Sequence, residues 1–147
     1  KVPPKTMVIS PEAEEAGRAL FNQGESLFHK EKKYAEAMEI YWQVYNTYPK
    51  LSVAEEALMM IGLCHVQLKQ DEKAIEVYQK AIREYPLLKG WIDATWFYLG
   101  CEYMRMGQKE KALEAYENCL AAGAGVRDPE RFPLKDAREA IAKIKGE

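Results

Sequence analysis

The sequence predicts an all-α fold, a right-handed α-solenoid of three stacked helical hairpins followed by a capping helix. Two stretches of equal length, EAMEIYWQVYNTYP at 36–49 and KAIEVYQKAIREYP at 73–86, share an alanine, a tyrosine and a closing Tyr-Pro at the same offsets. A weaker copy, KALEAYENCLAAG, begins at residue 111. No stretch alternates polar and apolar residues as a strand would, and none of the seven prolines interrupts a helical period.

The predicted elements begin with an extended arm, residues 1–9, which holds two adjacent prolines and little periodicity. One domain, residues 10–147, follows. Its first helix is expected to start at Pro11, because Ser10 can cap a helix and proline suits the first helical position. The six helices expected before residue 123 span about 11–30, 34–47, 52–68, 71–84, 89–106 and 109–122.

The ends of two helices carry local signals. Ser52-Val53-Ala54-Glu55 has the capping-box spacing, which supports the start of the third helix. Gly123 and Gly125 are expected to take the left-handed conformation that ends the sixth. Two further prolines delay the next helix to about residue 134. This last helix, about 134–146, has one apolar face made of Leu134, Ala137, Ile141 and Ile144.

The repeated unit is a pair of helices. Its alanines, Ala37, Ala74 and Ala112, are 37 and 38 residues apart, and a tyrosine follows each of them by four residues on the same helix face. Gly62 and Gly100 stand twelve residues before the last two alanines, inside apolar helices. Such a period indicates a solenoid, with units at about 11–49, 50–86 and 87–123.

These residues resemble the tetratricopeptide repeat (TPR), a unit of two helices. The resemblance covers roughly residues 14–122 and rests on Phe21, Gly24, Phe28, Ala37, Tyr41, Val44 and Pro49; on Leu58, Ile61, Gly62, His65, Ala74, Tyr78, Ala81 and Pro86; and on Trp96, Leu99, Gly100, Tyr103, Ala112, Tyr116 and Cys119. The units are longer than the standard 34 residues, a style that resembles repeats of bacterial cell-envelope assembly proteins. Glu25 follows Gly24 where a small residue is expected, so the first helix pair is expected to pack less closely.

Composition excludes several classes of function. The chain has 21 basic and 23 acidic residues and a net charge of -2, which gives no reason to expect nucleic-acid binding. Its longest stretch without a formal charge, Ala57 to Leu68, is too short to span a bilayer. The sequence has no glycine-rich phosphate loop, HExxH motif or nucleophile elbow, so we predict neither an enzyme nor a cofactor.

The histidines and cysteines fit packing better than chemistry. His65 takes the place of the family's tyrosine and is expected in the core, whereas His29 is either a binding contact or a solvated side chain. Cys119 occupies a small-residue position and is expected to pack. Cys64 and Cys101 lie on the first helices of adjacent units, where we favour free thiols over a disulfide. No metal site is predicted.

The resemblance implies that the first helix of each unit lines a concave groove, which in this family grips peptides or helices of partner proteins. Carried over position by position, the groove consists of Asn22, Ser26, His29 and Lys30; Met59, Leu63, Val66 and Gln67; and Phe97, Cys101, Met104 and Arg105. Its first end is polar and the remainder is apolar. TPR domains that clamp the acidic tail of heat-shock chaperones need Lys, Asn and Arg where Met59, Leu63 and Phe97 stand here. We therefore expect an apolar peptide or an amphipathic helix as the ligand.

Function is therefore expected on a surface. The leading hypothesis is a non-catalytic scaffold, an adaptor or assembly factor that holds a partner protein. The alternative is a self-associating module whose groove is buried in a homo-oligomer. The chain begins with Lys1-Val2-Pro3-Pro4 and not with Met, so either a leader has been removed or the chain was trimmed. Together with the style of the repeat, this beginning favours an exported or periplasmic location over a cytoplasmic one.

Overall fold

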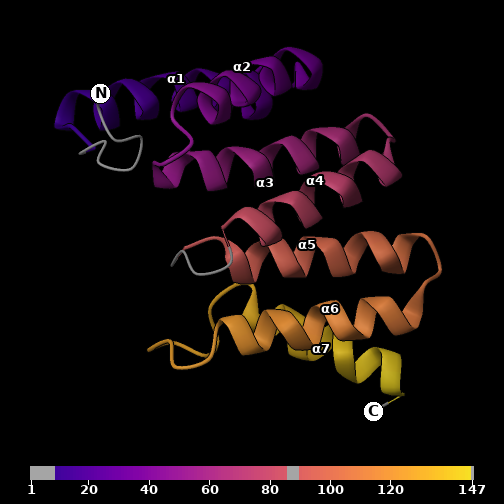
Figure 1. Cartoon of the computed structure of the whole chain (residues 1–147). Coiled ribbons are helices and arrows are strands. Elements are labelled where there is room, and N and C mark those ends of the chain that lie inside the picture. Colours follow the sequence, from indigo (N-terminus) through magenta and orange to yellow (C-terminus); the bar gives the residue numbers. More distant parts are fainter. Residues whose placement is uncertain (1–8, 86–89, 147) are drawn as a thin grey trace.

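A computed structural model describes residues 9–85 and 90–146, and this part of the chain is helical without strands, which confirms the all-α fold class. Its elements form three hairpins and a last helix (Figure 1). They are α1 (Pro11–His29) with α2 (Tyr34–Thr47), α3 (Ser52–Gln67) with α4 (Asp71–Glu84), α5 (Ile92–Arg105) with α6 (Lys109–Ala122), and α7 (Leu134–Lys145). Residues 1–8 of the predicted arm lie outside the described residues.

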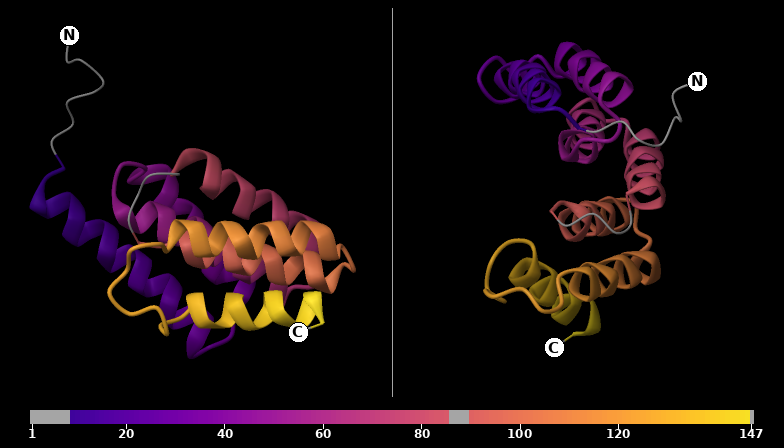
Figure 2. Two further views of the ribbon diagram at one scale, coloured as in Figure 1. Left: turned by 90° about the horizontal axis from the view of Figure 1, so that it is seen from below. Right: turned by 60° about the vertical axis from the view of Figure 1, so that its left-hand side comes forward.

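The hairpins stack along a curve (Figure 2). Each helix packs against the next one in the chain, as expected for a solenoid. In the right-hand view, α1, α3, α5 and α7 follow the inner side of the curve, while α2, α4 and α6 follow the outer side. The inner helices are thus the first helices of the three units and the last helix.

Close approach of the two helices in each hairpin depends on glycine. A Cβ atom at Gly62 would lie 2.2 Å from Cε1 of Tyr78, so any larger residue would overlap the ring. The corresponding distances are 2.7 Å for Gly24 with Tyr41 and 2.6 Å for Gly100 with Tyr116. We call these three pairs the glycine–tyrosine contacts. The contact in the first hairpin, at 2.7 Å, is the widest of the three, in the direction expected, but it differs from that of the third hairpin by only 0.1 Å.

The predicted helix starts are confirmed at α1 and at α3, which begins at Ser52, but the predicted cap of α3 is wrong. The Ser10 hydroxyl accepts a hydrogen bond from the Ala13 N–H at 3.1 Å, as expected of an N-cap. At α3 the N-cap is Leu51 and no side chain caps the helix, so the capping box does not form. Its carboxylate, Glu55, instead accepts a hydrogen bond from the backbone N–H of Trp91 at 3.1 Å.

The start of α5 is later than predicted. Gly90 has φ +152°, a conformation that residues with a side chain rarely adopt, and the helix begins only at Ile92. The Trp91 N–H is held by Glu55, which fixes this turn against α3. Residues 86–89, which were expected to include the first residue of this helix, lie outside the described residues.

The end of α6 combines a correct and a wrong expectation. Gly125 is left-handed, with φ +84°, as predicted. Gly123 has φ -90° and is not left-handed. It is small for a different reason, because a Cβ there would lie 2.3 Å from Cδ2 of Leu134. Gly123 therefore makes room for the start of α7.

The predicted apolar face of α7 is confirmed. Leu134 and Ala137 are buried, and Ile141 and Ile144 pack beside them against a core that includes Tyr116 of α6. α7 therefore covers the open side of the third hairpin, as a capping helix should. Of the helices in the described residues, none is both long and apolar enough to cross a membrane.

Candidate binding surface on the inner helices

The glycine–tyrosine contacts fix equivalent positions on the three inner helices. Positions on the three helices can be counted from Gly24, Gly62 and Gly100. The residue three before each glycine, and the residues one, four and five after it, are equivalent in the three units. On α3 and α5 these positions are the predicted groove residues, namely Met59, Leu63, Val66 and Gln67, and Phe97, Cys101, Met104 and Arg105. On α1 they are Phe21, Glu25, Phe28 and His29. The predicted residues Asn22, Ser26 and Lys30 are one position further along, so only His29 matches the register.

The surface of α1 is polar. Asn22 and Lys30 are exposed, and Ser26 is half-buried. His29 is exposed, and its Nε2 lies 3.5 Å from the Glu25 carboxylate. The polar first end of the predicted groove thus contains an internal pair of side chains.

The middle helix α3 is covered more fully than predicted. Eleven of its sixteen residues are buried, so its apolar residues on all sides pack within the chain itself. Met59 is only 4 % exposed and belongs to the core shared with α1 and α2. Leu63 and Val66 are half-buried, and Gln67 is exposed. The apolar surface that α3 leaves partly uncovered is therefore carried by Leu63 and Val66.

The residues of α5 are more open. Met104 is 37 % exposed, and Arg105 is exposed with its guanidinium 2.8 Å from the Glu102 carboxylate. Phe97 is half-buried, because the ring of Phe132, which precedes α7, packs edge-on against it at 5.3 Å between centroids. Since Phe132 is itself 46 % exposed, the two rings form an apolar patch at this end of the inner side.

The tyrosine hydroxyls end beside the position that follows each glycine. The Tyr41 hydroxyl donates a hydrogen bond to Glu25, and the Tyr116 hydroxyl donates to Sγ of Cys101 at 3.6 Å. At the equivalent place in the second unit stands Leu63, which cannot accept. The buried Tyr78 hydroxyl has no hydrogen-bond partner among the described residues. The position after each glycine therefore decides whether the hydroxyl is satisfied.

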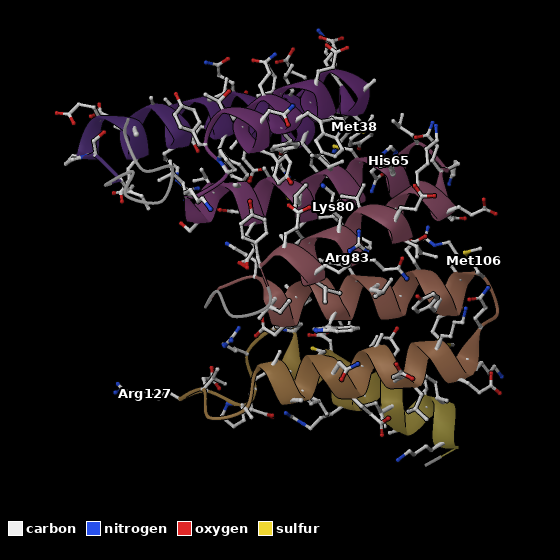
Figure 3. All side chains as sticks on the ribbon, in the orientation of Figure 1. Met38, His65, Lys80, Arg83, Met106 and Arg127 are labelled. Carbon is white, nitrogen blue, oxygen red and sulfur yellow. The ribbon has the colours of Figure 1, made fainter. Side chains whose placement is uncertain are left out.

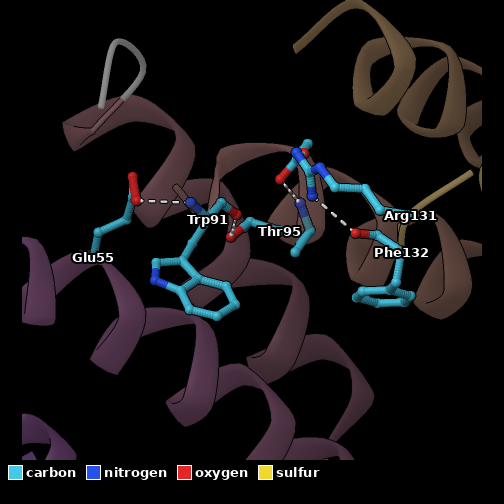
Figure 4. A network of polar contacts seen from close by, with 7 residues as sticks. Glu55, Trp91, Thr95, Arg131 and Phe132 are labelled. Carbon is cyan, nitrogen blue, oxygen red and sulfur yellow. Dashed lines mark hydrogen bonds and ion pairs between the residues drawn. The ribbon is translucent and has the colours of Figure 1, made fainter. Parts of the chain in front are cut away.

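Two buried carboxylates lie where units meet. Burial raises the pKa of Glu55 to about 7, and the nearby Asp93 carboxylate adds to the rise while the hydrogen bond from Trp91 opposes it. Asp93 is paired with Arg131 at 2.8 Å, and Figure 4 shows how this network joins the segment before α7 to the start of α5. Burial also raises the pKa of Glu102 to about 7, with a further contribution from Asp71.

The cysteines and His65 are packed side chains. Cys64, Cys101 and Cys119 are free thiols, and burial raises the pKa of Cys64 and of Cys119 to about 12, which leaves little thiolate. His65 is buried, with Nδ1 2.7 Å from the Gln70 side-chain oxygen, as the core prediction requires. Within residues 9–85 and 90–146, no group of three or more His, Cys, Asp or Glu side chains could hold a metal ion.

Sequence reasoning missed two clefts on the outer side. The first, the α2–α4 cleft, has a volume of about 460 Å³ and is lined by Trp42, His65, Lys73, Glu76, Val77, Gln79, Lys80 and Arg83. The second, the α4–α6 cleft, has a volume of about 480 Å³ and is lined by Gln79, Ile82, Arg83, Trp96, Leu99, Tyr103, Lys111, Glu114 and Ala115. No local sequence pattern marks these clefts, because the basic residues of α4, namely Lys73, Lys80 and Arg83, are interspersed with acidic ones.

Comparison with known families decides the nature of the repeat. Models of the tetratricopeptide repeat match residues 18–50, 56–87 and 94–122, which is more than half of the chain. The chain belongs to the tetratricopeptide repeat family. A comparison with curated protein sequences gives no match.

Several solved structures share this arrangement of helices. SycD of Yersinia enterocolitica, a type III secretion chaperone in complex with a peptide of the translocator YopD, has 12% identity and a TM-score of 0.75 over 92% of this chain and 97% of SycD. PcrH of Pseudomonas aeruginosa has 14% identity and a TM-score of 0.75 over 90% and 93%. The first TPR domain of Spaghetti (RPAP3), bound to the HSP90 peptide SRMEEVD, has 19% identity and a TM-score of 0.70 over 90% and 93%. At these identities the likeness concerns the fold.

Proposed function

We propose that this TPR protein is a non-catalytic adaptor that binds an apolar or amphipathic segment of another protein on the inner side of α3 and α5. The observation that carries the proposal is the apolar surface left there. Leu63, Val66 and Phe97 are only half-buried and Met104 is exposed, although the same helices bury another face in the core. Such surfaces mark interaction sites, and methionine adapts well to a bound segment.

Proteins of the same fold bind segments of other proteins. SycD has been solved with a peptide of YopD, and PcrH with the chaperone binding region of PopD. These complexes support the class of function proposed here, which is recognition of a peptide segment.

The α1 end of the surface limits the ligand. Arg18 forms an ion pair with Glu56 at 3.2 Å, and Glu25 is shared between His29 and Tyr41. The α1 end is therefore a polar surface whose charged groups are largely paired with one another, and it lies beside the apolar surface of α3 and α5. We therefore propose a ligand whose apolar side chains meet α5 and α3 and whose polar end meets α1.

A photo-crosslinking residue placed at Met104 tests the proposal in the native organism. The expected product joins this chain to a different protein, and Leu63→Glu in the same chain should abolish it. The control is the same crosslinker at Glu117, an exposed residue of α6, where no such product should form. A crosslink that is equally strong from Glu117, or insensitive to Leu63→Glu, would contradict the proposal.

The alternative function, self-association, gives a different result in the same experiment. The crosslinker at Met104 would then join two copies of this chain. Light scattering coupled to size-exclusion chromatography, carried out at several concentrations, would show an oligomer that Leu63→Glu dissociates.

A further inference from the structure

The α2–α4 cleft has an apolar floor. Val77 is 7 % exposed and Trp42 is half-buried, and the imidazole of His65 is fixed by its contact with Gln70. Figure 3 shows His65, Lys80 and Arg83 on the same visible side of the molecule. A cleft with an apolar floor and polar edges suits an amphipathic ligand.

One side of the cleft is fixed by contacts between α2 and α4. The Tyr45 hydroxyl donates to the Glu84 carboxylate, and Nζ of Lys80 lies 5.1 Å from the centre of the Tyr45 ring. Lys80 also pairs with Glu84 at 2.6 Å. These contacts hold the two helices together, and they partly neutralise Lys80.

Two other cations of the cleft remain available. Lys73 and Arg83 are exposed and form no ion pair with the described residues. They stand ten residues apart on α4, a separation of about 15 Å along the helix axis. Glu76 is the one acidic residue among those that line the cleft, so its edge is basic although the chain has a net charge of -2.

The α4–α6 cleft is less basic. It shares Arg83 and adds Lys111, but Glu114 faces the same space. The Lys111 ammonium lies 5.7 Å from the centre of the Tyr103 ring, so part of its charge is already engaged. The charge pattern therefore favours the α2–α4 cleft as a site.

We infer that the α2–α4 cleft is a second binding site, which takes an acidic segment of a partner protein. Two carboxylates of the segment pair with Lys73 and Arg83, and an apolar side chain between them lies on Trp42 and Val77. An extended chain covers about 15 Å in four to five residues. Charge complementarity selects this partner, because an acidic segment is attracted to a basic edge and a basic segment is repelled. The site lies on the outer side and is independent of the proposed function of the inner side.

Selection from a displayed library of random peptides tests the inference, with the full chain as the target. The expected peptides place acidic residues on both sides of an aromatic or aliphatic residue. The strongest of them is then synthesised, and its affinity is measured by calorimetry. The double variant Lys73→Glu/Arg83→Glu should weaken binding at least about tenfold, and binding should also weaken as salt is raised, since the paired charges are exposed.

A matched control carries the same change in net charge elsewhere. Arg127→Glu/Lys135→Glu reverses two exposed cations outside the cleft, and Figure 3 shows Arg127 well away from Lys80. This variant should bind the peptide like the wild type. Met104→Glu should also leave binding unchanged, which separates this site from the inner surface. Circular dichroism checks that each variant is folded. If Lys73→Glu/Arg83→Glu does not fold, Lys73→Gln/Arg83→Gln takes its place, and a smaller loss of affinity is expected for it.

Three outcomes would overturn the inference. In the first, the library yields no acidic class of peptide. In the second, Met104→Glu abolishes binding while the charge reversal does not. In the third, light scattering shows that the wild type is a dimer and that the Lys73→Glu/Arg83→Glu variant is a monomer. The occupant would then be a second copy of this chain.

Discussion

Three tyrosines with the same packing role have hydroxyl groups in different surroundings. The Tyr41 hydroxyl donates to Glu25 and the Tyr116 hydroxyl to Cys101, whereas the buried Tyr78 hydroxyl finds no partner among the described residues. An unsatisfied buried polar group lowers stability by about 1–3 kcal/mol. The middle unit therefore carries a cost that the first unit avoids.

The substitutions Tyr41→Phe and Tyr78→Phe should consequently have different effects on the free energy of unfolding. Removing the Tyr41 hydroxyl breaks a hydrogen bond to the Glu25 carboxylate, and we expect a loss of about 1.5–3 kcal/mol in the free energy of unfolding. Removing the Tyr78 hydroxyl should leave stability unchanged or raise it. Urea unfolding of both variants at one pH checks this, and equal destabilisation by both would count against the unsatisfied hydroxyl.

Gly62→Ala should destabilise the protein. The new methyl group would lie 2.2 Å from the Tyr78 ring, which is fully buried, and overpacking of this kind costs about 1–3 kcal/mol. Gly17→Ala is the matched variant in α1, where the methyl group would meet the flexible end of Leu51 at 3.0 Å. Alanine has a better helix propensity than glycine by about 1 kcal/mol, which should offset most of the destabilisation caused by the close contact with Leu51. Urea midpoints that do not differ between the two variants would refute this reading.

Stability should fall as pH rises through the window set by Glu55. Its pKa is raised by burial to about 7 from 4.5, so the folded state retains a proton that the unfolded state has lost between these values. The loss begins near pH 4.5 and levels off above about pH 7. In Glu55→Gln, the free energy of unfolding should fall by about 1–3 kcal/mol less across this pH range than in the wild type. Glu102, whose pKa is also raised to about 7, should account for a further part of the wild-type loss.

Denaturation midpoints measured between pH 4 and pH 8 check the prediction for Glu55. Glu39→Gln, on the exposed surface of α2, is the control and should follow the wild-type profile. If Glu55→Gln also follows the wild type at every pH, the buried carboxylate is not responsible.

At the scale of elements, the helices were predicted well because the repeated unit recurs in phase and the outer helices have one apolar face, although α3 is apolar on all sides. The exceptions concern a hydrogen-bond partner and a helix register that the spacing of residues does not reveal. Glu55 was expected to cap α3, but the Trp91 N–H binds its carboxylate. On α1 the predicted inner residues were one position out of register, because Gly24 stands thirteen residues before Ala37, whereas Gly62 and Gly100 stand twelve before their alanines. The register of α1 is seen only in the structure, where Gly24 contacts Tyr41.

The docking of α7 can be tested through a cysteine. Leu134 is buried against Gly123, and Cys119 lies fully buried in the same core. Leu134→Asp should detach α7, because it places a charge in that core, and should make Cys119 react faster with a thiol reagent. Cys64, in the core of the first two units, should stay protected.

Mass spectrometry after timed labelling identifies the modified cysteine. Lys135→Asp, on the exposed side of α7, is the control and should label like the wild type. Equal acceleration at Cys64 and Cys119 would mean that the whole chain unfolds and that α7 is not a separate cap.

At the scale of the whole molecule, stability should be highest in the centre. The core of α3 is shared with the helices before and after it, whereas α7 packs mainly on the third hairpin. Hydrogen exchange followed by mass spectrometry should therefore be slowest in α3 and faster in α7. A single exchange rate for all helices would indicate global unfolding without such a gradient.

The candidate sites were only partly predictable. The family resemblance directs attention to the first helix of each unit, and Leu63, Val66 and Met104 of α3 and α5 keep exposed surface. That Met59 is covered by its own chain depends on the curvature of the stack, which no local pattern encodes. The α2–α4 cleft depends on the spacing between second helices. The location of the protein in the cell stays a prediction.

The glycine–tyrosine contacts have a consequence for how such a protein can diversify. Each contact fixes the backbone of its hairpin, yet the residue directly after the glycine is Glu25, Leu63 or Cys101 without loss of that contact. Acidic, aliphatic and thiol side chains are thus interchangeable there on an unchanged scaffold. Mutation can therefore alter what the inner side recognises while the architecture is inherited intact, and Leu63→Glu would even provide Tyr78 with the acceptor that it lacks.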